Sequence, residues 1–261
     1  MKRFGIAIIV FVMTVLIASN AFAYNIGLIH AENYSPNVSS VVNYLSNYFG
    51  GGSTITSIDG TSQTPSIATL NTFDSVLVWE NVFFQDGVGL GNNLANYIDG
   101  GGGVVLAAFD FYGTNPQKLA GGIMGSNYSP FSPIGNYFSS ANLGTYDNTS
   151  PIMNGVTSLM GYYRDNVDLN AGAQLVASWT DGGELAAWNH GGQVVGITLY
   201  PGSQVPDGMM SGNYAELFGN SLIFSANAAQ PSAVPEPASL SLLGLGLLGL
   251  SGLKKRKEIG K

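Results

Sequence analysis

Strand-like runs alternate with helical patterns along the first half of the chain, and this order constrains the fold more than any other feature. The predicted strands lie at 26–29, 54–58, 75–79 and 103–109. Apolar residues recur at helical spacing over 36–49, between Ser35 and Gly50, and again over 90–98. The run 75–79 is continuously apolar, as expected where both faces of a sheet are covered. The alternation predicts a parallel α/β sheet with right-handed crossovers.

The second half of the body follows a different pattern. Residues 111–164 are rich in Gly, Pro, Asn and aromatic residues without a clear period, so we expect an insertion over the edge of the sheet. Short turns then separate three apolar runs and predict an antiparallel hairpin series over 173–199. A last helix carries Tyr214, Leu217 and Leu222 on one face.

The expected fold class is therefore α/β: a flavodoxin-like three-layer sandwich with a mostly parallel central sheet plus an antiparallel hairpin series. We expect this domain to cover residues 24–226 and a linker to follow at 227–234. The two ends of the chain lie outside the domain and carry signals of their own.

The N-terminal end has the three parts of a secretory signal peptide. A basic start, Met1-Lys2-Arg3, precedes an apolar run over residues 4–17, and Ala21-Phe22-Ala23 is a small-residue cleavage site. We expect the Sec export machinery and signal peptidase as partners, with cleavage after Ala23. The alternative is a retained N-terminal anchor, which the well-formed cleavage site disfavours.

The C-terminal end also combines an apolar run with a basic cluster, in the opposite order. The triplet Pro235-Glu236-Pro237 precedes an apolar run over 238–253, and Lys254-Lys255-Arg256-Lys257 follows. Sixteen residues make a helix of about 24 Å, short for a hydrocarbon core of about 30 Å. The basic cluster is expected to stay cytoplasmic, which places the body outside the inner membrane. The sequence predicts a marginal transmembrane helix.

This tail, residues 235–257, resembles the PEP-CTERM sorting signal in the order and spacing of its triplet, apolar helix and basic cluster. The resemblance implies that an exosortase, a membrane protease, cuts near Pro235, Glu236 and Pro237. It also implies retention at the inner membrane, followed by release to the cell surface or the extracellular space. In that family the tail accompanies surface proteins linked to exopolysaccharide or biofilm, so exopolysaccharide is a candidate partner.

Charge limits what the body can bind. Between residues 24 and 234 only Lys118 and Arg164 are basic, against fourteen Asp and Glu, which gives a net charge of −12. Nucleic-acid binding depends on Lys and Arg that neutralise phosphates, so no nucleic acid is expected as a partner. The chain has no cysteine, which excludes disulfides, thiolate metal ligands and a cysteine nucleophile.

The body resembles the class I glutamine amidotransferase-like fold, and in particular its trehalose-utilisation (ThuA)-like relatives. The segments that carry the resemblance are 73–78, 97–106, 150–156 and 192–201. In true amidotransferases, a cysteine follows the strand that corresponds to 103–109, and a histidine and a glutamate follow the last strand. Here Asp110 and its neighbours stand at the cysteine turn, Tyr200 in place of the histidine and Gly202 in place of the glutamate. The resemblance thus implies the fold without its chemistry, and we expect no cofactor.

Ligands of open α/β sheets bind beyond the carboxyl ends of the strands. His30, Glu32, Glu80 and Asp110 follow such ends and form a candidate metal or acid–base set from three loops. The alternative is that they are solvated loop ends of an acidic domain. The tryptophans lie within predicted strands and are expected in the core rather than on a sugar-binding platform.

Three functional hypotheses remain from the sequence. The body is a non-catalytic binding or structural domain of the envelope or matrix, a carboxylate- or metal-dependent hydrolase of envelope polysaccharide, or an adaptor in a surface complex. The missing nucleophile favours the first. Whether Glu32, Glu80 and Asp110 converge in space discriminates between the first two.

Overall fold

The computed structural model describes residues 23–112, 118–202 and 210–229. Half of its sheet is parallel, in the order β2-β1-β3-β4-β9. These strands are β1 (Asn25–Ala31), β2 (Thr54–Asp59), β3 (Ser75–Glu80), β4 (Gly103–Ala107) and β9 (Val194–Ile197). β3 and β4 are buried along their whole length, and for β3 this confirms the prediction from the continuous apolar run at 75–79.

The other half of the sheet is antiparallel, in the order β10-β6-β5-β7-β8, and joins the parallel half where β8 pairs with β9. Its strands are β5 (Phe131–Tyr146), β6 (Leu159–Leu169), β7 (Gln174–Trp179), β8 (Glu184–Asn189) and β10 (Ser211–Gly212). β7 to β9 confirm the predicted hairpin series. Among the described strands five pairings are antiparallel and four parallel, so the sheet is mixed and not mostly parallel.

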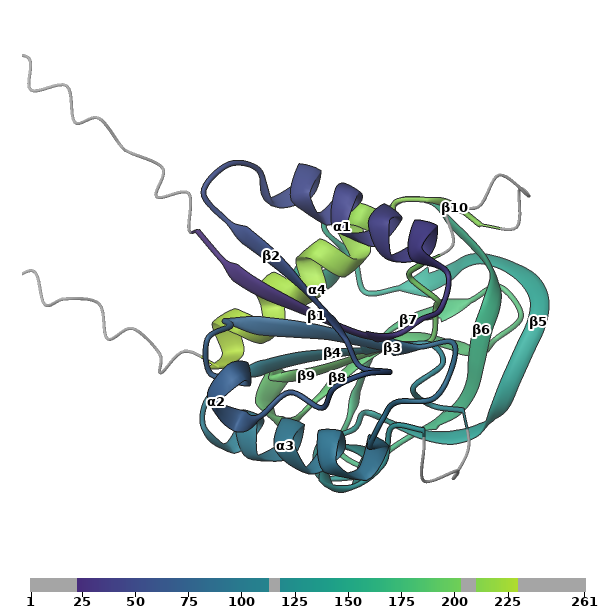
Figure 1. Ribbon diagram of the computed structural model, residues 1–261. Helices are drawn as coiled ribbons and strands as arrows, with labels where there is room; N and C mark the ends of the chain where they lie inside the picture. The colour runs from purple at the N-terminus through teal and green to yellow at the C-terminus, as the bar shows by residue number, and fades with distance from the viewer. Residues whose placement is uncertain (1–22, 113–117, 203–209, 230–261) are drawn as a thin grey trace, which may run out of the picture.

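The expectation of an irregular insertion over 111–164 is wrong where β5 and the first part of β6 lie, at 131–146 and 159–164. β5 and β6 pair there as a long antiparallel ribbon, seen at the right of Figure 1. The ribbon carries register shifts and exposes large apolar side chains such as Ile134 and Phe138. A half-exposed, bulged strand has neither a continuous apolar run nor a strict alternation, so its sequence gives no strand signal.

Helices cover both faces of the parallel half (Figure 1). α1 (Ser35–Phe49) and α4 (Tyr214–Ala229) pack on one face, and α2 (Ile67–Leu70) and α3 (Gly87–Asp99) on the other. Three short 3₁₀ turns complete the described elements: η1 (Gly122–Met124), η2 (Pro151–Met153) and η3 (His190–Gly192). The two apolar cores lie between these helices and the sheet.

Local sequence explains where the helices begin and end. Ser35 is the first helical residue of α1, and Tyr34 precedes it as the N-cap without a side-chain hydrogen bond. Pro36 needs no hydrogen-bond partner in this first turn. Gly50 ends α1 with a φ of 68°, which favours glycine. In α3 the Asp86 carboxylate accepts a hydrogen bond of 2.8 Å from Gly89 N, a cap of about 1 kcal/mol.

The first strand and the last helix meet at one end of the domain. The Tyr24 hydroxyl donates to Asn227 Oδ1 at 3.3 Å, and α4 continues to Ala229. Residues 227–229 are thus helical, and the remainder of the expected linker, 230–234, lies outside the described residues. So do residues 1–22 of the expected signal peptide and the sorting segment 235–257 with its expected apolar helix. Among the helices that the structure describes, none is long and apolar enough to cross a membrane.

Candidate functional site

The candidate residues from the sequence lie at the carboxyl ends of β1, β3 and β4, but on two faces of the sheet. Successive residues of a strand point to opposite faces. Trp79 belongs to the core on the α1 side, together with its neighbour in register, His30. Glu80, the next residue, points to the α3 side. The predicted set of four therefore divides into two clusters.

The first cluster surrounds the buried carboxylate of Glu32. Tyr34 N donates to Glu32 Oε1 at 2.8 Å, and the amides of Asn37 and Asn81 donate at 3.3 Å. The Tyr200 hydroxyl donates to Glu32 Oε2, and burial followed by this hydrogen bond raises the pKa of Tyr200 above its usual range. Tyr200 is thus a neutral donor at neutral pH, and four groups hold the Glu32 carboxylate in place.

His30 lies beside this cluster and faces away from Glu80. Its ring stacks on Trp79 at 5.1 Å, and its Nε2 lies 2.9 Å from Ser57 Oγ on β2. Its Nδ1 is buried without a hydrogen-bond partner in the part of the chain that is described. Burial lowers the pKa of His30, against the opposing charges of Asp59 and Glu32, which favours the neutral imidazole.

The second cluster begins with the ion pair of Glu80 and Lys118. Lys118 Nζ lies 2.9 Å from Glu80 Oε1, and Leu119 N donates to Glu80 Oε2 at 3.1 Å. The Glu80 side chain is fully buried. Burial raises its pKa to about 7, although Lys118 acts in the opposite direction. Lys118 also lies over the exposed rings of Tyr112 and Phe83, which cover the pair from outside.

Two further buried acids, Asp110 and Asp165, complete this cluster. Asp110 Oδ2 accepts from Ala107 N at 3.2 Å, and Asp165 Oδ2 accepts from Phe111 N at 3.3 Å. Burial first, and then the neighbouring carboxylates, raises the pKa of Asp110 well above its ordinary value. Burial does the same for Asp165. Each keeps one oxygen, Oδ1, without a hydrogen-bond partner among the described residues. Burial therefore favours the protonated, neutral form of both carboxyls.

Sequence reasoning missed Asp165 and Lys118. Lys118 follows the turn after β4, and Asp165 reaches the cluster from β6, 54 positions after its partner Phe111. The only sequence signal was the charged pair Arg164-Asp165 within a run rich in tyrosine. In residues 23–112, 118–202 and 210–229, no group of three or more His, Asp or Glu has the geometry to hold a metal ion.

An aromatic pair lies at the strand ends, formed by Phe109 in the turn after β4 and Tyr200 after β9. The resemblance of the sequence aligns this turn with the one that carries the cysteine in amidotransferases. Phe109 stacks on Tyr200, with ring centroids 5.6 Å apart and planes 18° from parallel. Phe138, from β5, contacts Phe109, and Tyr163, from β6, contacts Tyr200. The two positions thus carry neither a cysteine nor a histidine.

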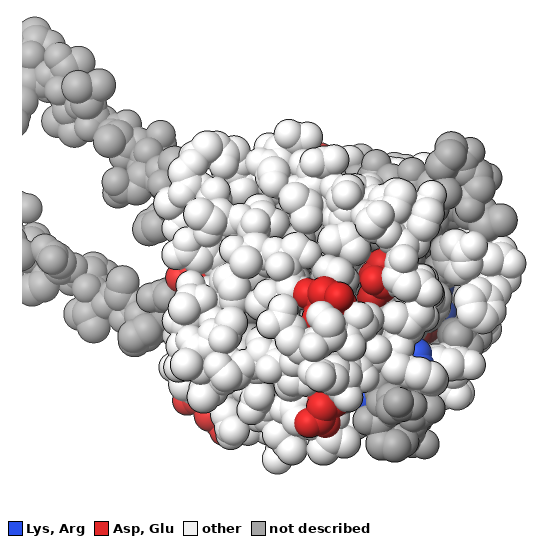
Figure 2. All heavy atoms as spheres, in the orientation of Figure 1, with Lys and Arg blue, Asp and Glu red and all other residues white. Residues whose placement is uncertain are grey.

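Both basic side chains of the described body are withdrawn from solvent. Lys118 forms an ion pair with Glu80. Arg164 is fully buried, its Nη2 lies 2.7 Å from Asp181 Oδ2, and its guanidinium lies over the ring of Trp179. Figure 2 shows the consequence: acidic groups are scattered over a mostly uncharged face, with little basic surface. Such a face suits neutral partners and repels anionic ones.

Comparison with known proteins identifies the tail. Residues 233–257 match the PEP-CTERM protein-sorting motif. This confirms the resemblance seen in the sequence of the tail, and it implies export, with membrane anchoring at the C-terminal end before an exosortase processes the chain. No curated protein matches the chain.

Solved structures with a similar fold are distant in sequence. A protein from Bacteroides uniformis described as ThuA-like is 10% identical, with a TM-score of 0.56, over 77% of this chain and 91% of its own. A ThuA-like protein from Parabacteroides merdae is 12% identical, with a TM-score of 0.50, over 82% and 94%.

A cytoplasmic protein from Salmonella typhimurium is 12% identical, with a TM-score of 0.56, over 77% of this chain and 98% of its own. At these identities the likeness shows the fold alone. The chain thus carries a PEP-CTERM sorting motif behind a body whose fold is similar to ThuA-like proteins.

Proposed function

We propose that this chain is an exported envelope or extracellular-matrix protein whose body binds or supports other components without catalysing a reaction. The observation that carries the proposal is the stacked pair of Phe109 and Tyr200 in the place of the amidotransferase nucleophile and base. The sorting motif at 233–257 supports the location. Before processing, the tail holds the domain at the inner membrane, and afterwards the domain reaches the cell surface or the medium.

The geometry of the two ends supports this arrangement. Tyr24 and Asn227 are hydrogen-bonded, so the described part of the chain begins and ends on one side of the domain. The carboxyl ends of the parallel strands, with Glu32 and Tyr200, lie at the opposite end. A domain tethered through α4 therefore presents the ribbon of β5 and β6 and the strand ends away from the membrane.

A second candidate function is a carboxylate-dependent or metal-dependent hydrolase of envelope polysaccharide. The raised pKa values of Glu80 and Asp110 favour it, because a general acid must hold a proton at neutral pH. Asp110 and Asp165 are almost fully buried, however, and the ion pair of Glu80 is covered by Tyr112 and Phe83. A substrate must displace these groups before it reaches a carboxyl.

The test is an assay of the exported protein for both activities. Ammonia release from glutamine and reducing ends released from the polysaccharide of the host envelope are measured beside the Asp110→Asn variant. The proposal predicts no turnover above the variant in either assay. Turnover that Asp110→Asn abolishes would contradict the proposal and establish the hydrolase.

A further inference from the structure

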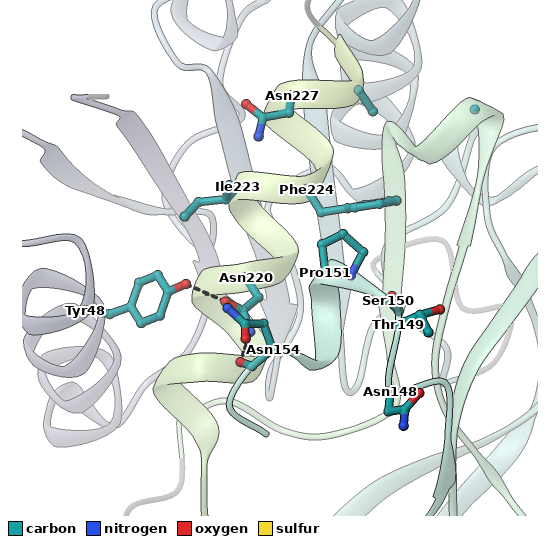
Figure 3. A pocket seen from close by; sticks show the side chains of 12 residues that line it. Tyr48, Asn148, Thr149, Ser150, Pro151, Asn154, Asn220, Ile223, Phe224 and Asn227 are labelled. Carbon is teal, nitrogen blue, oxygen red and sulfur yellow. Dashed lines mark hydrogen bonds between the residues drawn. The ribbon is translucent and has the colours of Figure 1, made fainter. Parts of the chain in front are cut away.

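A hollow of about 700 Å³ lies at the end of the domain opposite the strand carboxyl ends. Figure 3 shows it between α4, the end of α1 and the loop before η2. Ser225 on α4 bonds to Ser75 at the start of β3, which places this half of α4 over the amino ends of the strands. The hollow is thus separate from both acid clusters. Its volume is within the range of about 300–1,000 Å³ that is usual for small-molecule sites.

One buried amide fixes the walls of the hollow. Asn220 Oδ1 accepts from the Tyr48 hydroxyl at 2.5 Å, and Asn220 Nδ2 donates to the carbonyl oxygens of Ile152 and Asn154 at 3.1 and 2.7 Å (Figure 3). These bonds tie α1, α4 and the segment around η2 together. A preformed hollow costs a ligand less ordering entropy than a flexible one.

Three polar side chains around the rim are not used by the fold. The side chains of Asn148, Ser150 and Asn154 make no hydrogen bond to any described residue, although all three line the hollow. Asp147 holds the turn beneath them, since its Oδ1 accepts from Thr149 N at 2.9 Å. Two of these side chains, Asn148 and Ser150, belong to this turn, and Asn154 follows η2. Amides and a hydroxyl that both donate and accept therefore line the hollow.

The remaining wall is apolar and aromatic. Phe224 is half-buried, and its ring centroid lies 6.0 Å from that of Trp188. It lines the hollow together with Ile223 and Pro151. No charged side chain is among the lining residues, and no lysine or arginine is exposed in the described part of the body. The site has nothing to pair with an anion. It offers free amides and hydroxyls on one side and an apolar surface on the other.

We propose that this hollow binds an uncharged saccharide. Sugar hydroxyls both donate and accept hydrogen bonds, as the rim amides do, and the C–H face of a sugar ring suits the surface formed by Phe224 and Pro151. The net charge of −12 on the body disfavours acidic polysaccharides. This inference rests on the proposed function, because it gives the non-catalytic domain a ligand class and a place to bind it.

Calorimetric titration of the exported full-length protein in detergent tests the inference. The probes are cellotetraose, maltotetraose, mannotetraose and the acidic tetragalacturonate. We expect at least one neutral probe to bind and the acidic probe not to bind. The double variant Asn148→Ala/Asn154→Ala should weaken binding by about tenfold or more, because each lost hydrogen bond contributes about 1 kcal/mol. Asn96→Ala, an exposed amide on α3, is the matched control and should bind like the native chain.

Three results would overturn the site and leave the proposed function standing. They are the absence of binding for all neutral probes up to about 10 mM, unchanged affinity in the double variant, and equal affinity for tetragalacturonate. Chromatography of the titrated samples shows whether a bound probe is cleaved. Cleavage would contradict the non-catalytic function but would still agree with a binding site at the hollow. The two proposals therefore fail in distinguishable ways.

Discussion

The hydroxyl of Tyr200 donates a hydrogen bond to the carboxylate of Glu32 and so joins the loops that follow β9 and β1. The resemblance of the sequence to amidotransferases aligns Tyr200 with their histidine. Its raised pKa keeps the phenol protonated, so it donates to Glu32 and does not act as a base at neutral pH. Its ring packs at the strand ends, against Phe109 and Tyr163.

Substitution of Tyr200 by Phe is expected to lower the free energy of unfolding by about 1–3 kcal/mol. The change removes one donor from a buried carboxylate and leaves part of its hydrogen-bonding capacity unsatisfied. Urea denaturation measures the effect. Tyr34→Phe is the matched control, because only the backbone of the exposed Tyr34 bonds to Glu32, and a change within about 0.5 kcal/mol is expected. Equal losses in the two variants would contradict the role assigned to the hydroxyl.

The buried acids predict a pH-dependent stability. A carboxyl whose folded pKa is raised stabilises the native state below its unfolded pKa, and this stability is lost as pH rises toward the folded value. For Glu80 that window extends from 4.5 to about 7. For Asp110 and Asp165 it begins near 3.8 and extends well above it. The lowered pKa of His30 makes the native state more stable as pH rises, which opposes the effect of the acids. The test therefore compares a variant that lacks one acid with the native chain at each pH.

Asp110→Asn should therefore become more stable relative to the native chain as pH rises from 4 to 8. The difference in unfolding free energy should grow by up to about 1.4 kcal/mol per pH unit. Denaturation curves at several pH values measure it, with the exposed Asp168→Asn as the control. A difference that does not change with pH would show that Asp110 titrates normally in the fold.

Because Lys118 and Glu80 form a buried ion pair, we expect the effects of substituting them on the free energy of unfolding to be strongly non-additive. Lys118→Met leaves Glu80 buried without its counter-ion and should cost about 3–5 kcal/mol, whereas adding Glu80→Gln should recover most of that loss. A double-mutant cycle by chemical denaturation measures the coupling. Additive effects of the two substitutions would mean that the pair contributes nothing beyond its separate contacts.

The sequence predicts the parallel half of the fold better than the rest. The run 75–79 and the helix begun by Ser35 and Pro36 are local signals, and the structure confirms both elements. β5 gives no such signal, because its ribbon is bulged and half-exposed. Its position depends on pairing with β6 rather than on its own pattern.

The candidate site, like the fold, can be predicted only in part from the sequence. The placement of Glu32, Glu80 and Asp110 at strand ends follows from the order of the elements. Which of them meet depends on the alternation of strand faces and on the register of distant strands. Asp165 joins Asp110 only because β6 returns beside the turn after β4. Neither relation can be read from local spacing.

The tail predicts a specific processing defect. Substitution of Pro235, Glu236 and Pro237 by alanine should leave the protein full-length and membrane-bound, because the exosortase loses its recognition triplet while the apolar run and basic cluster remain. Truncation before Val234 should instead release the domain into the periplasm. Cell fractionation and immunoblotting measure both outcomes. Pro231→Ala, which changes a proline outside the triplet, is the control and should be processed normally.

The most direct test of the central proposal is the intact mass of the protein recovered from the cell surface or the medium. Sorting by the C-terminal motif predicts a chain that begins at Tyr24 and ends near the triplet 235–237. The apolar segment and the basic cluster are then absent from the released protein. Released protein that still carries Lys254 to Lys257 would contradict the account and show the tail to be a permanent part of the mature chain.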